Sequence, residues 1–142
     1  MYKEVKLLEQ TEAAYIAGLI DGEGTITLSR RHRSENRQLV ISISNTERPL
    51  LEYVLYSVGA GKITGKKTYQ PHHTASFTYA ISNRQAIALL HQTFPYLKTY
   101  KAKRSDIILH DYIRLTPRNG YYSPEIKKAR TDFEHKVMKI KS

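Results

Sequence analysis

The sequence predicts an α+β fold in which one four-stranded antiparallel sheet is backed by helices. Two pairs of segments alternate polar and apolar residues, as half-buried strands do. A helix-like stretch precedes the first pair, and another follows each pair. The length of 142 residues is that of one domain with a sizeable core. The predicted order is therefore helix, hairpin, helix, hairpin and then further helices, with the helices covering one face of the sheet.

Local signals justify the individual elements. Thr11 is a suitable N-cap for the first helix, and Gly22 and Gly24 are suited to end it. Pro49 fits the first turn of the second helix, and Asn83 is the expected cap of the third. In chain order, the predicted elements are a helix over 11–21, strands over 25–30 and 38–44, a helix from about 49 to 58, strands over 62–69 and 74–82, and helices over 84–94, 103–115 and 125–139.

The charge of the chain favours a nucleic-acid partner. Lys and Arg number 23 against 13 Asp and Glu, which gives a net charge of +10 and a pI of about 9.8. An acidic membrane surface, or a basic protein that is merely soluble, is the alternative. The absence of cysteine excludes disulfides, zinc–thiolate sites and cysteine nucleophiles. No apolar run is long enough to span a membrane, and residues 1–6 lack a secretory h-region, so we expect an intracellular protein.

The two faces of the predicted sheet differ sharply in polarity. Alternation directs one set of side chains toward the helices, namely Ile26, Leu28, Leu39, Ile41, Ile43, Phe77, Tyr79 and Ile81. The opposite face would carry Thr25, Thr27, Ser29, Gln38, Val40, Ser42, Thr64, Lys66, Thr68, Ser76 and Thr78. It has no acidic residue, and the hairpin loops add Arg30, Arg31, Arg33, Arg37 and Lys67. An ordinary solvated face is one interpretation. The other is a DNA-contacting face, since a two-stranded ribbon fits the major groove and strands of ~9 residues span roughly nine base pairs.

One segment, residues 16–24, is unusual in itself. Small residues cluster along the short helix that contains it, where two backbones could approach closely. Asp21 and Glu23 follow at once, and Gly22 and Gly24 flank the second acid. From the residues alone, this is a tight helix-packing site combined with an acid site, or a solvated acid in a turn.

The segment IAGLIDGEG closely resembles the LAGLIDADG motif of homing endonucleases. Seven of its nine positions follow the motif when Glu23 is counted as a chemical match for the last acid. The predicted αββαββα order, the Ser44-Asn45-Thr46 turn and the Leu97…Lys101 spacing also resemble the family. The resemblance covers about residues 11–115 and implies a single endonuclease domain over 1–142, with 116–142 as a helical C-terminal extension.

The resemblance also implies roles for particular residues. Glu23 corresponds to the acid that holds a divalent metal, Mg²⁺ with Mn²⁺ as a substitute, and the backbone carbonyl of Gly22 joins it. Asn45 corresponds to the polar residue that orders water near the metal. Lys101 is the best match for the lysine of the basic pocket, with Lys98 and Lys103 as alternatives. The implied reaction is metal-assisted hydrolysis of DNA phosphodiester bonds.

Only one copy of the motif is present, which resembles the homodimeric members of the family. The expected dimer interface consists of Ala13, Ala14, Ala17, Gly18 and Asp21. Asp21 is also expected to cap or position the motif helix rather than to bind metal. Two sheets would cover roughly twenty base pairs of a pseudo-palindrome. The alternative is an RNA-splicing maturase that binds intron RNA, or a DNA-binding protein that does not cleave.

Other charged residues are interpreted as surface groups. His72 and His73 fall at a hairpin tip, and Asp106 with His110 forms an i,i+4 surface pair. Phosphate contacts are expected of a basic cluster made up of Lys98, Lys101, Lys103 and Arg104. A solvated face is expected of the C-terminal set made up of Lys127, Lys128, Arg130, Lys136, Lys139 and Lys141.

Overall fold

A computed structural model describes residues 3–65 and 74–142 of the chain. The described elements are α1 (Gln10–Glu23), β1 (Gly24–Ser29), β2 (Gln38–Asn45), α2 (Arg48–Val58), β3 (Lys62–Gly65), β4 (Phe77–Ser82), α3 (Asn83–Thr93), a 3-10 turn (Phe94–Tyr96), α4 (Tyr100–Asp111) and α5 (Pro124–Lys139). This order confirms the predicted α+β class. The predictions for Lys66, Lys67, Thr68, His72 and His73 lie outside the described residues.

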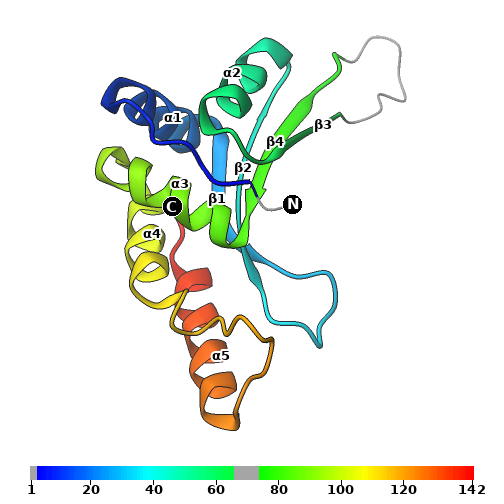
Figure 1. Cartoon of the computed structure of the whole chain (residues 1–142), viewed down its shortest axis with the longest axis vertical. Helices are drawn as coiled ribbons and strands as arrows, with labels where there is room; N and C mark the ends of the chain where they lie inside the picture. Colours follow the sequence, from blue (N-terminus) through cyan, green and yellow to red (C-terminus); the bar gives the residue numbers. More distant parts are fainter. Residues whose placement is uncertain (1–2, 66–73) are drawn as a thin grey trace.

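The four described strands form one antiparallel sheet with the order β1-β2-β4-β3. In the first hairpin Gly24 pairs with Ile43 and Ser29 with Gln38. The central pairing joins β2 to β4, with Asn45 opposite Phe77. The loop between β1 and β2 therefore lies at one end of the sheet, whereas β3 ends and β4 begins at the opposite end (Figure 1).

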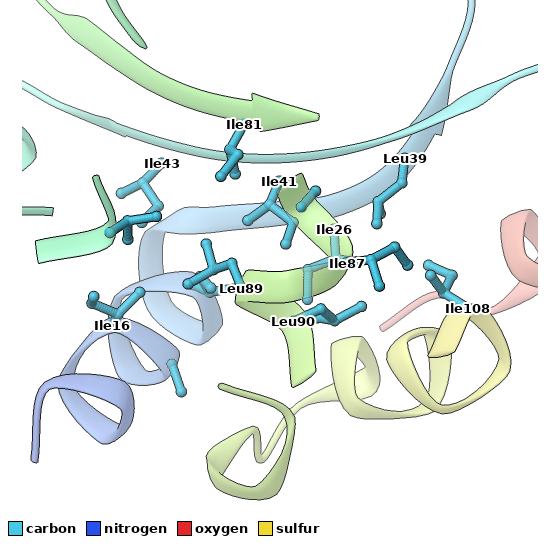
Figure 2. Packing of buried hydrophobic residues seen from close by; sticks show 14 of the residues in the cluster. Ile16, Ile26, Leu39, Ile41, Ile43, Ile81, Ile87, Leu89, Leu90 and Ile108 are labelled. Atoms are coloured by element: carbon cyan, nitrogen blue, oxygen red, sulfur yellow. The ribbon is translucent and has the colours of Figure 1, made fainter. Parts of the chain in front are cut away.

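The core lies between the sheet and the helices. Alternate strand residues are almost fully buried, including Ile26, Ile41, Ile43 and Tyr79, as the sequence predicted. Side chains from α1, α3 and α4 approach them from below the sheet (Figure 2). Burial of such aliphatic side chains stabilises the fold by about 1.5–3 kcal/mol each.

Several element boundaries differ from the predictions because capping groups were misassigned. The first helix begins at Gln10, since Glu9 forms a capping box with Glu12, and it continues to Glu23. The fourth helix begins at Tyr100, because Thr99 caps it by accepting from the backbone N–H of Lys101.

The third helix also differs at its start. Ser82 is its N-cap, and Asn83 has a left-handed φ of 55° while its Oδ1 accepts a hydrogen bond from the hydroxyl of Tyr112. Asn tolerates this conformation better than most residues. The strand predicted from residue 74 begins at Phe77.

Two cations predicted to be at the surface are buried instead. Arg104 donates to the carbonyls of Ile140 and Ile26, at 2.7 and 2.9 Å. Arg130 is 1% exposed. Each guanidinium is hydrogen-bonded to backbone carbonyls of other elements, as buried polar groups generally are. Arg104 is therefore not a phosphate contact, and Arg130 does not belong to a solvated face. None of the described helices has the length and apolar character needed to cross a membrane.

Candidate functional site

The end of α1 delivers an exposed carboxylate to one end of the sheet. The backbone N–H of Gly24 closes the helix by donating to the carbonyl of Ile20, and β1 begins at the same residue. A Cβ at position 24 would lie 2.8 Å from both the Ile20 Cα and the Ser42 carbonyl oxygen. Only glycine allows helix and strand to meet this closely. Glu23, one residue earlier, is consequently held at the junction with its side chain exposed.

Asn45 lies beside Glu23. Its Nδ2 donates to Glu23 Oε2 at 2.5 Å. Its Oδ1 accepts from the backbone N–H of Glu47 at 2.7 Å, and this contact fixes which way the amide faces. Two residues separated by 22 positions thus form one polar site, with Glu23 Oε1 left for another partner.

Asp21 is bound into the fold rather than exposed for a partner. Its carboxylate accepts from the backbone N–H groups of Lys98 and Thr99, at 2.7 and 3.2 Å, and from the Thr99 hydroxyl at 2.6 Å. Burial opposes its ionisation, but these hydrogen bonds and the nearby charge of Lys101 outweigh that effect, so the pKa of Asp21 is below its usual value. Asp21 therefore ties the end of α1 to the start of α4. Its predicted place in a dimer interface stays a prediction.

Among the three candidate lysines, Lys101 is the one that reaches the motif helix. Its Nζ donates to the carbonyls of Ile20 and Asp21, at 2.7 and 2.9 Å, and the residue is 7% exposed. Burial lowers the pKa of Lys101, and the negative charge of Asp21 partly opposes this. A cation at a helix C-terminus also complements the helix dipole. Lys98 and Lys103 are exposed.

The oxygen atoms at this end fit a hard divalent cation. Glu23 supplies a carboxylate, and the preceding carbonyl of Gly22 lies at the helix end beside it. Mg²⁺ takes oxygen ligands and is commonly bound through one or two carboxylates together with substrate phosphates. Within residues 3–65 and 74–142, no group of three or more His, Asp or Glu side chains could hold a metal.

The sheet face opposite the helices is polar. Thr25 and Ser42 are paired across β1 and β2 with their hydroxyl oxygens 2.7 Å apart, and Ser44 and Thr78 are similarly 2.8 Å apart. The register places the predicted residues Thr25, Thr27, Ser29, Gln38, Val40, Ser42, Thr64 and Thr78 on this face. It adds Lys62, Ser44, Ala80 and Ser82, which the sequence analysis did not assign to it. Their alternation with Thr64 and Thr78 was the available signal. Ser76 precedes β4 and lies outside the sheet.

Basic side chains border this face at the first hairpin loop, residues 30–37. Arg30, Arg31 and Arg33 are exposed there, and Arg37 is half-buried. A hollow of about 410 Å³ lies where the loop meets the sheet, lined by Ser29, Arg30, Arg31, Glu35, Asn36, Gln38, Val40 and Ser82. The loop and the polar face thus form one continuous surface, which we call the polar–basic face.

The exposed side of α1 carries only part of the predicted set of small residues, with Gly18 exposed and Ala14 half-buried. Ala13 and Ala17 are buried in the chain's own core, so they are not available for a dimer interface. Gly18 and Gly22 are exposed, and a Cβ at either would meet nothing within 4 Å. Tyr15 lies on the same helix face by its spacing and is 51% exposed, with its ring edge-on to Tyr53 at a centroid distance of 5.6 Å.

The pair Asp106 and His110 forms no contact with each other. His110 Nδ1 instead lies 3.0 Å from Asp111 Oδ1, and Arg114 donates to the same oxygen at 2.6 Å. Hydrogen bonds from Arg114 and His110 lower the pKa of Asp111. This cluster is a surface ion-pair group on α4 and just beyond it.

Comparison with known proteins shows which family model the chain matches. A family model described as a LAGLIDADG-like domain matches residues 10–93, more than half of the chain. This matched segment runs from the start of α1 to the end of α3 and contains Glu23 and Asn45. No curated protein sequence matches the chain.

Solved structures resemble the fold over nearly the whole chain. The homing endonuclease I-CvuI in complex with its target in the presence of Ca aligns with a TM-score of 0.74 and 17% identity, covering 94% of this chain and 83% of that one. I-CvuI with an I-CreI target in the presence of Mg, where the DNA is not cleaved, gives 0.74 and 18%, with the same coverage. The archaeal intron-encoded homing endonuclease I-Vdi141I, complexed with DNA, gives 0.60 and 18%, covering 93% and 85%. The αββαββα order, the motif helix and the match over residues 10–93 agree, and the chain belongs to the LAGLIDADG family.

Proposed function

We propose that the protein is a site-specific, metal-dependent DNA endonuclease that acts as a homodimer on a long pseudo-palindromic site. The observation that carries this proposal is the Glu23–Asn45 pair at the end of the motif helix, next to a sheet face with no acidic residue. A basic surface attracts the phosphates of DNA, and an exposed carboxylate beside it can hold a metal ion next to them. The DNA complexes of the similar structures support the same partner.

The polar–basic face would bind the DNA. Its paired hydroxyls and the amide of Gln38 can donate to or accept from base edges, and the arginines of residues 30–37 can contact guanine or phosphate. Lys98 and Lys103, exposed on and just before α4, are suited to phosphate contacts outside the grooves. The net charge of +10 would strengthen binding and make it dependent on salt.

At the reacting phosphate, Glu23 and the carbonyl of Gly22 would hold Mg²⁺, or Mn²⁺ in its place. The metal supplies polarisation of the scissile phosphate and activation of the attacking water. Asn45 fixes the orientation of Glu23 through its Nδ2 and, in this position, borders the space where water would lie. Lys101 holds the helix end that presents both donors, and its positive charge stabilises negative charge that develops there.

A homodimer is proposed because one chain carries one such acid end, whereas cleavage of both strands needs two. The open surface over Gly18 and Gly22 on α1, next to the exposed ring of Tyr15, allows a second motif helix to approach closely. The two Glu23 residues would then meet near the two-fold axis. The whole chain would work as one endonuclease domain inside the cell, where its DNA target lies.

The test is selection on a randomised double-stranded DNA library with Mg²⁺, with Ca²⁺ as the binding-only condition. We expect cleavage of a pseudo-palindrome in Mg²⁺ and binding without cleavage in Ca²⁺. Glu23→Gln should reduce cleavage by at least about a thousandfold and retain binding, whereas Glu52→Gln, which changes an exposed acid on α2, should retain both. Specific binding with no cleavage would contradict the nuclease assignment. No enrichment of any DNA in either ion would point to RNA as the partner and favour the maturase alternative.

A further inference from the structure

The base of the first hairpin loop is hydrogen-bonded to side chains of the C-terminal helix α5. Arg130 NH2 donates to the backbone carbonyl of Arg37 at 2.5 Å, and NH1 donates to the carbonyl of Leu115 at 3.0 Å and to the Thr116 hydroxyl. Its Nε donates to Glu134 Oε2 at 3.0 Å, one turn further along α5. One guanidinium thus links the last helix, the end of the α4 region and the residue that leads into β2.

Glu134 contacts Arg37 as well, at its backbone N–H and its side chain. Its Oε2 accepts from the backbone N–H of Arg37 at 3.2 Å, and Oε1 lies 3.9 Å from Arg37 Nε. The amide N–H and the carbonyl of Arg37 are therefore both held by the ion pair of α5. We call Arg130 and Glu134 the α5 clamp.

Tyr112 extends this contact to the first buried residue of β2. Its hydroxyl accepts from the backbone N–H of Leu39 at 3.1 Å and donates to Asn83 Oδ1 at 2.9 Å. The guanidinium of Arg130 stacks over the Tyr112 ring at 4.7 Å from its centroid. The start of β2 is consequently fixed at Arg37 and Leu39, whereas residues 31–35 before it are exposed.

A second ion pair on α5 shows that the clamp is more than a helix-stabilising pair. Lys128 and Asp132 have the same i,i+4 spacing, lie 3.5 Å apart and have side-chain exposures of 80% and 68%. Arg130 and Glu134 have exposures of 1% and 7%. Burying two charges is expensive unless they are fully hydrogen-bonded. Here one bond from Arg130 and one to Glu134 join the backbone of Arg37 at the entry of β2, while Arg130 also bonds Leu115 and Thr116. This buried ion pair therefore fixes the base of the loop.

We propose that Arg130 and Glu134 are positioning residues for DNA recognition: through Arg37 they set where the arginines of residues 30–37 sit, and thereby determine discrimination at the base pairs that this loop reads. This inference rests on the proposed function. The clamp lies outside residues 10–93, the segment matched by the family model, and neither clamp residue contributes to the polar–basic face itself.

The first test uses the unmodified protein without DNA and measures backbone hydrogen exchange. The amides of Arg37 and Leu39 should exchange at least about a hundredfold more slowly than those of residues 31–34, because their N–H groups donate to Glu134 and Tyr112. Equal exchange at Arg37 and at residues 31–34 would overturn the proposal, whatever the protein binds.

The second test compares Glu134→Gln with Asp132→Asn, which makes the same acid-to-amide change at an exposed position of the same helix. Target selection should show a loss of on the order of tenfold in base preference for Glu134→Gln, confined to the base pairs read by the loop, with the central base pairs unchanged. Asp132→Asn should reproduce the wild-type profile. A uniform loss of affinity at all positions would indicate a merely structural role and would overturn the proposal, as would an unchanged profile.

A double variant covers the case in which Glu134→Gln does not fold. Arg130→Met with Glu134→Leu removes both charges and keeps the volume, a change that buried ion pairs often tolerate. The same local loss of base preference is expected. Failure of the proposed function is distinguishable, because the wild-type protein would then select no DNA site at all.

Discussion

Two junctions fix the helices to the ends of the sheet, and they use buried cations differently. At the acid end, Lys101 donates to the last carbonyls of α1, and Asp21 accepts from the start of α4. At the loop end, Arg130 donates to carbonyls of the chain and also pairs directly with Glu134. Both cations are at most 7% exposed and both satisfy backbone carbonyls.

The difference lies in how each charge is neutralised. Arg130 is matched by the carboxylate of Glu134 at hydrogen-bond distance, so its charge is balanced directly by an ion pair. The Nζ of Lys101 contacts carbonyl oxygens, while the nearest acid, Asp21, bonds its carboxylate to Lys98 and Thr99. The charge of Lys101 is therefore balanced less directly than that of Arg130, through the nearby charge of Asp21 and not through an ion pair. A joint that only positions a segment can neutralise its charges, whereas a joint beside the reacting phosphate of the proposed endonuclease would benefit from leaving a charge available.

The largest effect on stability is expected from breaking the loop-end joint. Glu134→Ala leaves the guanidinium of Arg130 buried without its carboxylate and should lower the free energy of unfolding by about 3–5 kcal/mol. Asp132→Ala on the same helix should change it by less than about 0.5 kcal/mol. Urea denaturation followed by circular dichroism measures both. Equal effects of the two substitutions would show that burial of the clamp contributes nothing.

An intermediate effect is expected at the acid-end joint. Lys101→Met removes two charge-assisted hydrogen bonds from the end of α1 and should lower the free energy of unfolding by about 2–3 kcal/mol. The control is Lys103→Met, two residues away on the exposed side of α4, which should be nearly neutral. Urea denaturation midpoints of the two variants measure this difference. A Lys101→Met protein as stable as its control would contradict the view that Lys101 stabilises the end of α1.

The pH dependence of stability gives a finer test of the same joint. The pKa of Asp21 is lower in the folded chain than in the unfolded chain, so its carboxylate stabilises the fold above the unfolded value of about 3.9. This contribution is lost as the pH falls through the folded pKa. Asp21→Asn should therefore be less stable than wild type at pH 7, and the gap should narrow below about pH 4. A gap that is constant from pH 7 to pH 3 would mean that the ionised form is not what matters.

The smallest effect on the fold is expected at the exposed glycine of α1. Gly18→Leu places its side chain where nothing lies within 4 Å, so the isolated chain should keep its stability or gain up to about 1 kcal/mol from helix propensity. In the proposed dimer the same side chain would separate the two motif helices. Sedimentation should then show a shift from dimer to monomer, which Thr131→Leu on α5 should not cause. An unchanged dimer would reject the packing over Gly18.

The sequence was most informative where burial follows a local period. Ile41 and Ile43 could be assigned to the core, and Thr25 and Ser42 to the other face, because a strand alternates its side chains by geometry alone. The order of elements followed in the same way. The neighbourhood of Glu23 and Asn45 came from the family resemblance, and their chemical roles stay predictions.

What the sequence did not reveal depends on partners far along the chain. Arg104 and Arg130 occur in basic stretches and were assigned to the surface. Their burial depends on carbonyls at Ile26 and Arg37, 78 and 93 residues away. Likewise, Asp21 finds its partner in Thr99, 78 residues on, and nothing local to the motif indicates this. Thr99 itself had a recognisable signal, since a threonine before a helical stretch is a common cap.

The contact between Arg104 and β1 has a consequence for how copies of this chain can associate. β1 is an edge strand of the sheet, and such edges can recruit strands from other molecules into aggregates. Arg104 occupies the carbonyl of Ile26 on this strand and also holds Ile140, so the C-terminal residues are retained beside the edge. A guanidinium at that position both removes an acceptor and places a charge where a foreign strand would have to dock. Self-association through strand addition is thereby disfavoured at β1.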